Sequence, residues 1–286
     1  RVEKIINGNG LSLNDDFKIY WQNNPIAHLN SGKNYLEPEI KIITDDILEI
    51  DHKKKLQVYL ENWIKTLISN QLEDLVNLYK IEKKNSSVRA LCYQLFENNG
   101  VLKRENVGEF IKKLSQEDRK VLRKNGIKIG RYHIYLYKII KPEAVRIRLL
   151  LWKNFYNSNL NFIPPKFGLN FIIQEKKLDP YLMLICGFEK FNDFFIRIDI
   201  LERLFIKIIE NTINNQTKLN SDMVNLIGCS NENFLKLLTR MKYKYEKKEN
   251  TIYFKYISNK SKKIFKKLKT KNTDNPFKIL SEVNFK

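Results

Sequence analysis

The feature that most constrains the fold is the central stretch, residues 89–155, in which apolar residues recur at helical spacing between clear helix starts and stops. Gly100 follows two asparagines, and a glycine in that place supplies the left-handed stop of a helix. Ser115 precedes acids that would lie in the first helical turn, where the helix dipole favours negative charge. Pro142 follows Lys141 and suits the first position of a helix. The stretch therefore predicts several packed helices.

A long amphipathic helix precedes this stretch. Residues 51–80 predict one helix, because apolar residues from Leu56 to Tyr79 recur at steps of three and four, which places them on one helical face. We therefore expect a helical core over residues 51–155.

The first fifty residues carry strand and turn signals instead. FKIYW (residues 17–21), IAHL (26–29) and EIKII (39–43) are rich in β-branched and aromatic residues and are separated by Asn-, Pro- and Gly-containing turns. A small β lead-in is therefore expected over residues 1–50.

Residues 156–195 have the composition of a connector. They are rich in asparagine and contain Pro164-Pro165, a pair that helices and central strands exclude. Residues 181–191, YLMLICGFEKF, are the apolar part and predict a short buried element.

Residues 196–257 predict a winged-helix-like domain. A helix over 199–211 is followed by a short helix, the Gly228-Cys229-Ser230 turn and a second helix from Asn231, which is the helix-turn-helix pattern. Two alternating segments on either side of Glu249-Asn250 then predict a hairpin, the wing.

Residues 258–286 form a basic tail. SNKSKKIFKKLKTKN contains seven lysines and no acid, and charge of this density makes salt-sensitive phosphate contacts. The terminal NPFKIL is apolar enough to dock as a short helix. The predicted fold class is mainly α (α+β): a small β-strand unit, a helical core, a winged-helix-like module and the tail.

The charge of the chain points to a polyanionic partner. Its formal net charge is +20, which favours RNA, DNA or an anionic membrane surface. Drift in base composition is the alternative, because lysine far outnumbers arginine. The longest apolar run is too short to span a membrane, so we expect no membrane partner.

The cysteines and histidines indicate neither a disulfide framework nor a zinc site. Cys92, Cys186 and Cys229 lie far apart with no Cys/His cluster, and reduced thiols fit the cytoplasm. His133 has no Ser, Cys or carboxylate partner nearby in sequence, so no catalytic residue, metal ligand or cofactor is predicted in this chain.

The residues predicted to contact nucleic acid lie in the central stretch, the second motif helix with its wing, and the tail. For the first pair, Arg131 and His133, the alternative is that Arg131 caps the preceding helix and His133 forms hydrogen bonds inside the fold. The full set is Arg131, His133, Lys236, Arg240, Lys242, Lys244, Lys247, Lys248, Lys262, Lys263, Lys266 and Lys267.

Four local patterns resemble those of a known protein group. They are R-A-L-x-x-Q-L-x-E-x-x-G-V-L at residues 89–102, L-R-x-x-G-I-x-x-G-x-Y-H-I-Y-L at 122–136, L-I-G-C-S at 226–230 and N-P-F-x-x-L at 275–280. Together they are similar to the C-terminal region of bacterial ATP-dependent helicases related to the DExH RNA helicase of the mitochondrial degradosome.

The resemblance implies a non-catalytic accessory region of a superfamily-two RNA helicase. The motor would lie upstream in the same polypeptide and would hold the ATP and Mg, because this chain has neither a GxxxxGK[ST] loop nor a DExH box. Alone, the chain should neither hydrolyse ATP nor unwind a duplex. The start at Arg1 fits a piece of a longer protein.

Three functions remain open. The first is binding of single-stranded nucleic acid beside the motor. The second is a docking scaffold that recruits an RNA-degradation partner such as an exonuclease. The third is a winged-helix DNA-binding module.

Overall fold

The structure is a computed structural model that describes residues 2–8, 10–43, 50–81, 86–158, 161–174, 178–191, 193–248 and 251–257. It mixes helix and sheet, as the predicted α+β class requires. The chain divides into two compact units, Arg1–Phe205 and Ile206–Lys286, which are taken separately below. Among the described helices, none combines the length and apolarity that a membrane crossing needs.

The N-terminal part of the first unit is a four-stranded antiparallel sheet in the order β1-β2-β3-β4. Three of its strands lie where the alternating pattern predicted them, whereas a first helix and the three-residue β1 were not predicted. The elements are α1 (Val2–Asn7), β1 (Leu11–Leu13), β2 (Lys18–Trp21), β3 (Asn24–Asn30) and β4 (Glu39–Ile42).

The predicted long helix is α2 (Ile50–Gln71), and it contacts β4, α1 and the later helix α7 (Pro142–Phe155). Its buried stripe recurs every four residues, at Leu56, Leu60, Ile64 and Ile68. The helix was predicted to continue to residue 80, but α2 ends at Gln71, and α3 (Glu73–Val76) and η1 (Asn77–Lys80) carry the apolar pattern onward.

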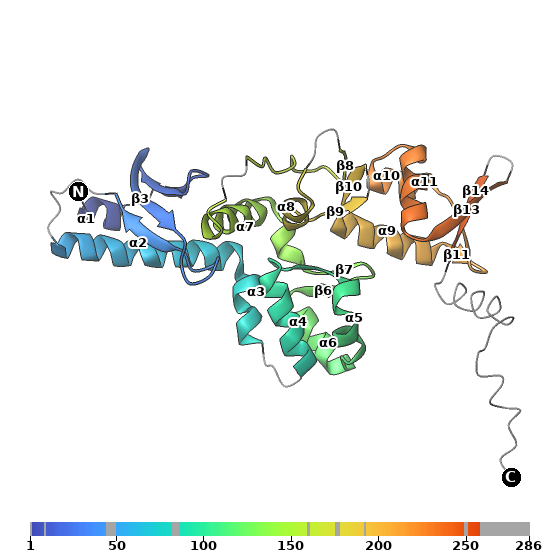
Figure 1. Cartoon of the computed structure of the whole chain (residues 1–286), viewed down its shortest axis with the longest axis horizontal. Helices are drawn as coiled ribbons and strands as arrows, with labels where there is room; N and C mark the ends of the chain where they lie inside the picture. Colours follow the sequence, from blue (N-terminus) through green and yellow to red (C-terminus); the bar gives the residue numbers. More distant parts are fainter. Residues whose placement is uncertain are drawn as a thin grey trace, which may run out of the picture. The chain divides into compact units, whose positions relative to one another are not determined.

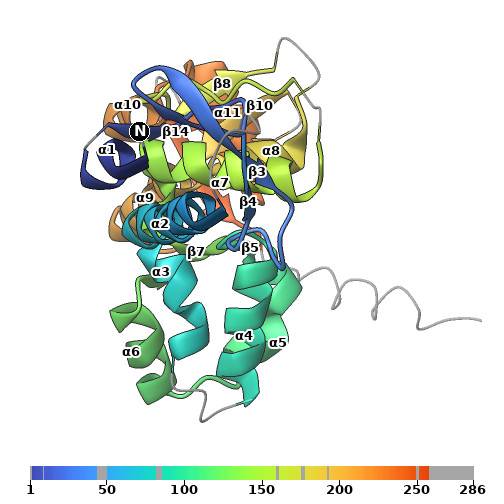
Figure 2. The ribbon, with the colours of Figure 1, turned by 90° about the vertical axis from the view of Figure 1, so that its left-hand side faces the viewer.

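The central stretch forms short helices around a three-stranded antiparallel sheet in the order β5-β7-β6. Figures 1 and 2 show α3, α4, α5 and α6 gathered on one side of this sheet. The elements are α4 (Ser86–Glu97), β5 (Val101–Lys103), η2 (Arg104–Val107), α5 (Gly108–Lys112), α6 (Gln116–Lys124), β6 (Ile127–Ile129), β7 (His133–Leu136) and η3 (Tyr137–Ile140).

The predicted helix boundaries in this stretch are present. Gly100 has a φ of +80°, and its N–H donates to the carbonyl of Leu95 at 2.6 Å. Ser115 forms a capping box with Asp118 at the start of α6. Pro142 is at the start of α7. These boundaries are encoded within a few residues of each helix end, which is why they can be read from the sequence.

Residues 156–195 were expected to be a connector with a short buried element at 181–191. The buried element is present, and the segment holds more regular structure than was expected. They contribute to an antiparallel sheet in the order β8-β10-β9 and to a buried apolar cluster that includes Leu182, Phe188 and Phe195. Strands of three or four residues are too short to give a clear periodic signal. The elements are β8 (Phe171–Ile173), α8 (Pro180–Ile185), β9 (Phe188–Phe191) and β10 (Phe194–Arg197).

The second unit contains the end of α9, two further helices and a four-stranded antiparallel sheet in the order β11-β12-β14-β13. Asn220 and Ser230 accept hydrogen bonds as N-caps of the two helices, and Gly228 between them is left-handed. The elements are α9 (Ile198–Glu210), β11 (Thr212–Ile213), β12 (Gln216–Lys218), α10 (Ser221–Ile227), α11 (Asn231–Arg240), β13 (Tyr243–Lys248) and β14 (Thr251–Tyr256) (Figure 1). The predicted tail, 258–286, lies outside the described residues.

One buried arginine joins several parts of the first unit. Arg148 of α7 has 0% exposure, and its guanidinium donates to the carbonyls of Asn99 at 2.6 Å, Ile139 at 2.8 Å and Ile185 at 2.6 Å. Asn99 lies in the turn just after α4, and Ile139 and Ile185 lie in the last turns of η3 and α8, where helix dipoles favour a cation. Burial lowers the pKa of Arg148 to about 10, so the group stays charged at neutral pH.

We expect Arg148→Met to lower the free energy of unfolding by about 3–5 kcal/mol, because three buried carbonyls lose their donor. The matched control is Arg146→Met on the same helix. Arg146 is 34% exposed and pairs with Glu143 and Asp15, so its loss should cost about 1 kcal/mol or less. Urea unfolding of both variants measures the difference, and equal losses would contradict the role given to Arg148.

Candidate nucleic-acid interface

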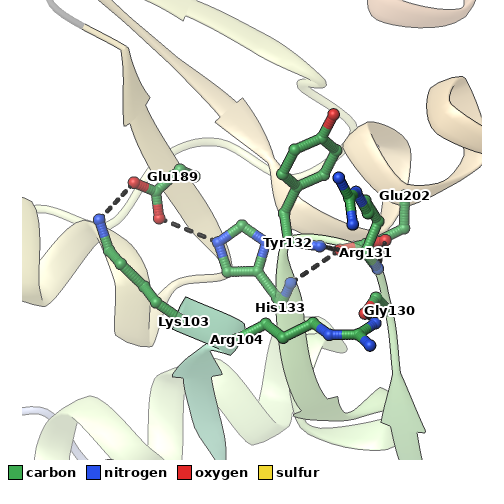
Figure 3. A network of polar contacts seen from close by, with 8 residues as sticks. All are labelled: Lys103, Arg104, Gly130, Arg131, Tyr132, His133, Glu189 and Glu202. Carbon is green, nitrogen blue, oxygen red and sulfur yellow. Dashed lines mark hydrogen bonds and ion pairs between the residues drawn. The ribbon is translucent and has the colours of Figure 1, made fainter. Parts of the chain in front are cut away.

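The loop between β6 and β7 is held by one carboxylate, as Figure 3 shows. Glu202 of α9 accepts hydrogen bonds from the backbone N–H groups of Arg131, Tyr132 and His133 at 2.6, 2.8 and 2.8 Å. Burial alone would raise the pKa of Glu202, but bonds from His133 and from these N–H groups lower it overall. The loop conformation therefore depends on an ionised Glu202.

Gly130 is needed because Glu202 lies against it. A Cβ at this position would be 2.3 Å from the carboxyl carbon of Glu202, well inside van der Waals contact. Arg104 fixes the same residue from the other direction, because its Nη1 donates to the Gly130 carbonyl at 2.6 Å. The G-R-Y-H sequence of the loop thus has a structural explanation in the contacts of Gly130 with Glu202 and Arg104.

His133 lies inside the fold, with 2% of its side chain exposed. Its Nε2 is 2.9 Å from Glu189 Oε2, its Nδ1 is 3.7 Å from Glu202 Oε1, and Lys103 Nζ is 2.5 Å from Glu189 Oε1 (Figure 3). Burial lowers the pKa of His133, but the hydrogen bond to Glu189 and the nearby carboxylates of Glu189 and Glu202 outweigh this effect and raise the pKa overall. The imidazole is therefore stabilised in its charged form.

The burial of His133 corrects its prediction as a contact residue. A ring with 2% exposure has no surface to offer a nucleic acid, and the alternative of hydrogen bonding inside the fold describes its position. The two carboxylate partners of His133 could not be predicted from the sequence, because Glu189 and Glu202 are 56 and 69 residues away from it. His133 can influence a ligand only through the loop it helps to hold.

Arg131 is exposed, unlike His133. Its guanidinium carbon lies 5.7 Å from the ring centroid of Phe205, which is a cation–π distance. Its backbone is fixed by Glu202. Arg131 therefore remains a predicted phosphate contact, on a loop whose position is set by buried charges.

Two further arginines near Arg131 were missed by the sequence analysis. Burial, together with the like charges of Arg131 and Arg119, lowers the pKa of Arg104. These three side chains, which we call the arginine cluster, come from η2, α6 and the β6–β7 loop. Because they are spread over 28 residues of sequence, no local pattern indicates that they meet. Guanidinium groups suit bidentate phosphate binding.

The predicted contact residues of the second unit lie on α11, the following turn and β13. Lys236 and Arg240 are on the exposed side of α11, opposite the buried Phe234, Leu237 and Leu238. Lys236 Nζ is 3.0 Å from Glu232, so part of its charge is compensated. The other predicted residues here are exposed as well: Lys242, Lys244, Lys247 and Lys248.

The pleat of the hairpin divides its lysines between two faces. Tyr243 and Phe254 are 7% and 1% exposed, which defines the inner face of the sheet, and Lys247 shares that face by alternation. Lys244 and Lys248 lie on the opposite face. The four tail residues, Lys262, Lys263, Lys266 and Lys267, are outside the described part of the chain.

The described residues contain no group of three His, Cys, Asp or Glu side chains that could hold a metal ion. Burial raises the pKa of Cys186 to about 12 and that of Cys229 to about 11, so neither thiol is activated as a nucleophile. A pocket of about 840 Å³ lies between β4 and α2, and Glu37, Glu39 and Glu61 are part of its lining. Its acidic character is unsuited to a polyanion.

Comparison of the chain with protein-family models, with curated proteins and with solved structures finds no match.

We expect the free energy of unfolding to fall as pH rises above about 6.5, because the folded state raises the pKa of His133. The stabilisation is complete below the unfolded pKa and is lost as pH passes the folded pKa. Glu189 and Glu202 act oppositely: their pKa values are lowered, so their contribution is lost only in acid. Urea unfolding between about pH 6 and pH 9 should show a slope that His133→Gln reduces. An unchanged slope would exclude His133 as its source.

We also expect Gly130→Ala to lower the free energy of unfolding by about 2–4 kcal/mol, because the added Cβ displaces the carboxylate that binds three N–H groups. Gly108→Ala is the matched control, since a Cβ there meets nothing within 4 Å. Its stability should be equal to or slightly above that of the parent. Thermal unfolding followed by circular dichroism compares the two, and a neutral Gly130→Ala would contradict the contact.

Proposed function

We propose that this chain is a non-catalytic accessory region that binds single-stranded nucleic acid. The observation that carries the proposal is the excess of exposed cations on α11 and the β13–β14 hairpin. From Asn231 to Tyr256, which spans both elements, the chain has seven lysines and arginines against three glutamates. Such an excess on one small unit favours a polyanion by counterion release.

We further propose that the second unit is a winged helix. The order of elements, α9, β11–β12, α10, α11 and the β13–β14 hairpin, supports this, as do the pairing of β14 between β12 and β13 and the left-handed Gly228 between α10 and α11. In such motifs the first residues of the second helix read base edges.

The start of α11 argues against sequence-specific reading of a duplex. Its first turn is Asn231, Glu232 and Asn233, with an acid where a groove-reading helix would approach phosphates. Its cations, Lys236 and Arg240, come later in the helix. This distribution favours phosphate contacts over base-edge contacts, and hence binding without strong sequence preference.

The first unit supplies a second place for phosphate contact, the arginine cluster. Arg131 is exposed there, and repulsion from Arg131 and Arg119 contributes to the lowered pKa of Arg104. A bound phosphate would relieve this repulsion. This electrostatic argument supports phosphate binding at the arginine cluster. The proposal therefore includes nucleic-acid contacts by both units.

The resemblance of the four motifs extends the proposal to the parent protein. We infer a cytoplasmic ATP-dependent RNA helicase whose motor, with its ATP and Mg, lies upstream of this region. The alternative within the same resemblance is a scaffold that recruits an exonuclease, with the positive charge incidental. Salt dependence separates the two, because apolar docking responds little to ionic strength.

We expect the full chain to bind a fluorescein-labelled single-stranded RNA with an affinity that falls about 100-fold between about 50 and 200 mM salt, as about five phosphate contacts require. Fluorescence anisotropy measures this. Arg131→Gln should reduce the slope of log K against log salt by about 0.7, the value for one contact to a single strand.

Three other outcomes would change the proposal. No binding at about 50 mM salt would exclude nucleic-acid binding by this chain and leave the docking scaffold. Tighter binding to a palindromic duplex than to the single strand would favour the winged-helix DNA-binding module. Binding that is insensitive to salt would exclude the phosphate contacts that carry the proposal.

A further inference from the structure

The sheet of the second unit has a face that turns away from its helices. Thr217, Tyr243 and Phe254 are 2%, 7% and 1% exposed, so they mark the inner face. Strand residues alternate between faces, and residues paired directly across two strands share one. The other face, which we call the outer sheet face, includes Lys218, Lys244, Glu246, Lys248, Tyr253 and Lys255.

The strand register places two lysines of the outer sheet face directly opposite each other. Lys244 of β13 pairs with Lys255 of β14, so their Cβ atoms are about 5 Å apart. Like charges in this arrangement destabilise a sheet. Within the described residues, no carboxylate forms an ion pair with either ammonium group. The sheet therefore keeps an unfavourable pair that a bound anion would stabilise.

Protection of an exposed edge does not account for these lysines. Edge strands often carry lysine because it prevents pairing with another chain, and β13 is an edge strand here. Lys218 and Lys255, however, lie on β12 and β14, the two inner strands of the sheet. The positive charge thus extends over the middle of the face, where edge protection has no role.

An aromatic ring lies among these charges. Tyr253 pairs with Lys218 on one side and with Glu246 on the other, and Lys248 Nζ is 5.9 Å from its ring centroid. The side chain is half-buried, so its position on the sheet is supported by its neighbours. A tyrosine on a sheet face that carries four lysines and one glutamate matches the chemistry of single-strand binding, in which bases stack and phosphates contact cations.

We propose that the outer sheet face is a stacking platform for single-stranded nucleic acid. A base stacks on Tyr253, and the flanking phosphates contact Lys244 and Lys255, with Lys218 and Lys248 at the sides. The proposal rests on the proposed function and goes beyond it by placing the principal contact of the second unit on the sheet instead of on α11. A duplex cannot use this platform, because its bases are stacked on one another.

The test compares three double variants and two single ones by anisotropy, using labelled single-stranded RNA, single-stranded DNA and duplex RNA over a range of salt. Lys244→Gln with Lys255→Gln removes the opposed pair. Lys236→Gln with Arg240→Gln removes the same charge from α11, and Lys120→Gln with Lys124→Gln removes it from exposed positions of α6. Tyr253→Leu removes the ring, and Tyr253→Phe retains it.

The variants have distinct expected signatures. The double variant of Lys244 and Lys255, called the sheet pair below, should weaken single-strand binding about 20-fold at about 100 mM salt. It should also reduce the slope of log K against log salt by about 1.4. Tyr253→Leu should weaken binding about 10-fold at every salt concentration without changing the slope, because stacking releases no counterions. Tyr253→Phe and the α6 pair should remain within about 2-fold of the parent.

The proposal is overturned if the parent binds but the sheet pair and Tyr253→Leu behave like the α6 pair; in that case the proposed function stands and the contact lies elsewhere. A dominant loss from the α11 pair, with none from the sheet pair, also overturns it. If the parent binds none of the three nucleic acids, both the platform and the proposed function fail. A thermal melt of each variant by circular dichroism confirms that the unit remains folded.

Discussion

The first unit depends on the charge of Arg148, a guanidinium removed entirely from water. Such a group is costly to bury unless its donors are bonded. Both terminal nitrogens donate to carbonyls at or just after the ends of α4, η3 and α8, whereas Nε has no hydrogen-bond partner among the described residues. One side chain on α7 thereby connects the central helices to the segment that follows them. Ile185 at the end of α8 accepts one of the hydrogen bonds of Arg148, which adds to the apolar packing of segment 156–195 against α7.

Buried charges are also stabilised by polar partners around His133, where the central groups are carboxylates. Glu189 and Glu202 are largely buried, and each is stabilised in its ionised form by named donors. Glu202 binds the loop backbone, and Glu189 joins His133 to Lys103. The result is a rigid loop that presents Arg131 at the surface.

The two units use positive charge differently. In the first, Arg104 and Arg119 each donate a hydrogen bond to a backbone carbonyl, which fixes the position of the guanidinium group and leaves its other donors for a ligand. In the second, the lysines stand on a regular sheet whose register decides which of them share a face. A lysine on a strand keeps its charged group in water without needing buried partners, which suits contacts that are many, weak and salt-sensitive. Arginine suits one contact of defined geometry.

The sequence by itself determined the local boundaries and the chemistry of the surface. The stop at Gly100, the capping box at Ser115 and the turn at Gly228 depend on residues within one helical turn, and the excess of lysine needs only counting. Tertiary structure alone decided that His133 lies between two glutamates, that Arg148 closes three helix ends, and that Lys255 faces Lys244. These contacts join residues that are far apart in the sequence. Such contacts produce no periodic pattern of apolar and polar residues, so they cannot be predicted from the sequence.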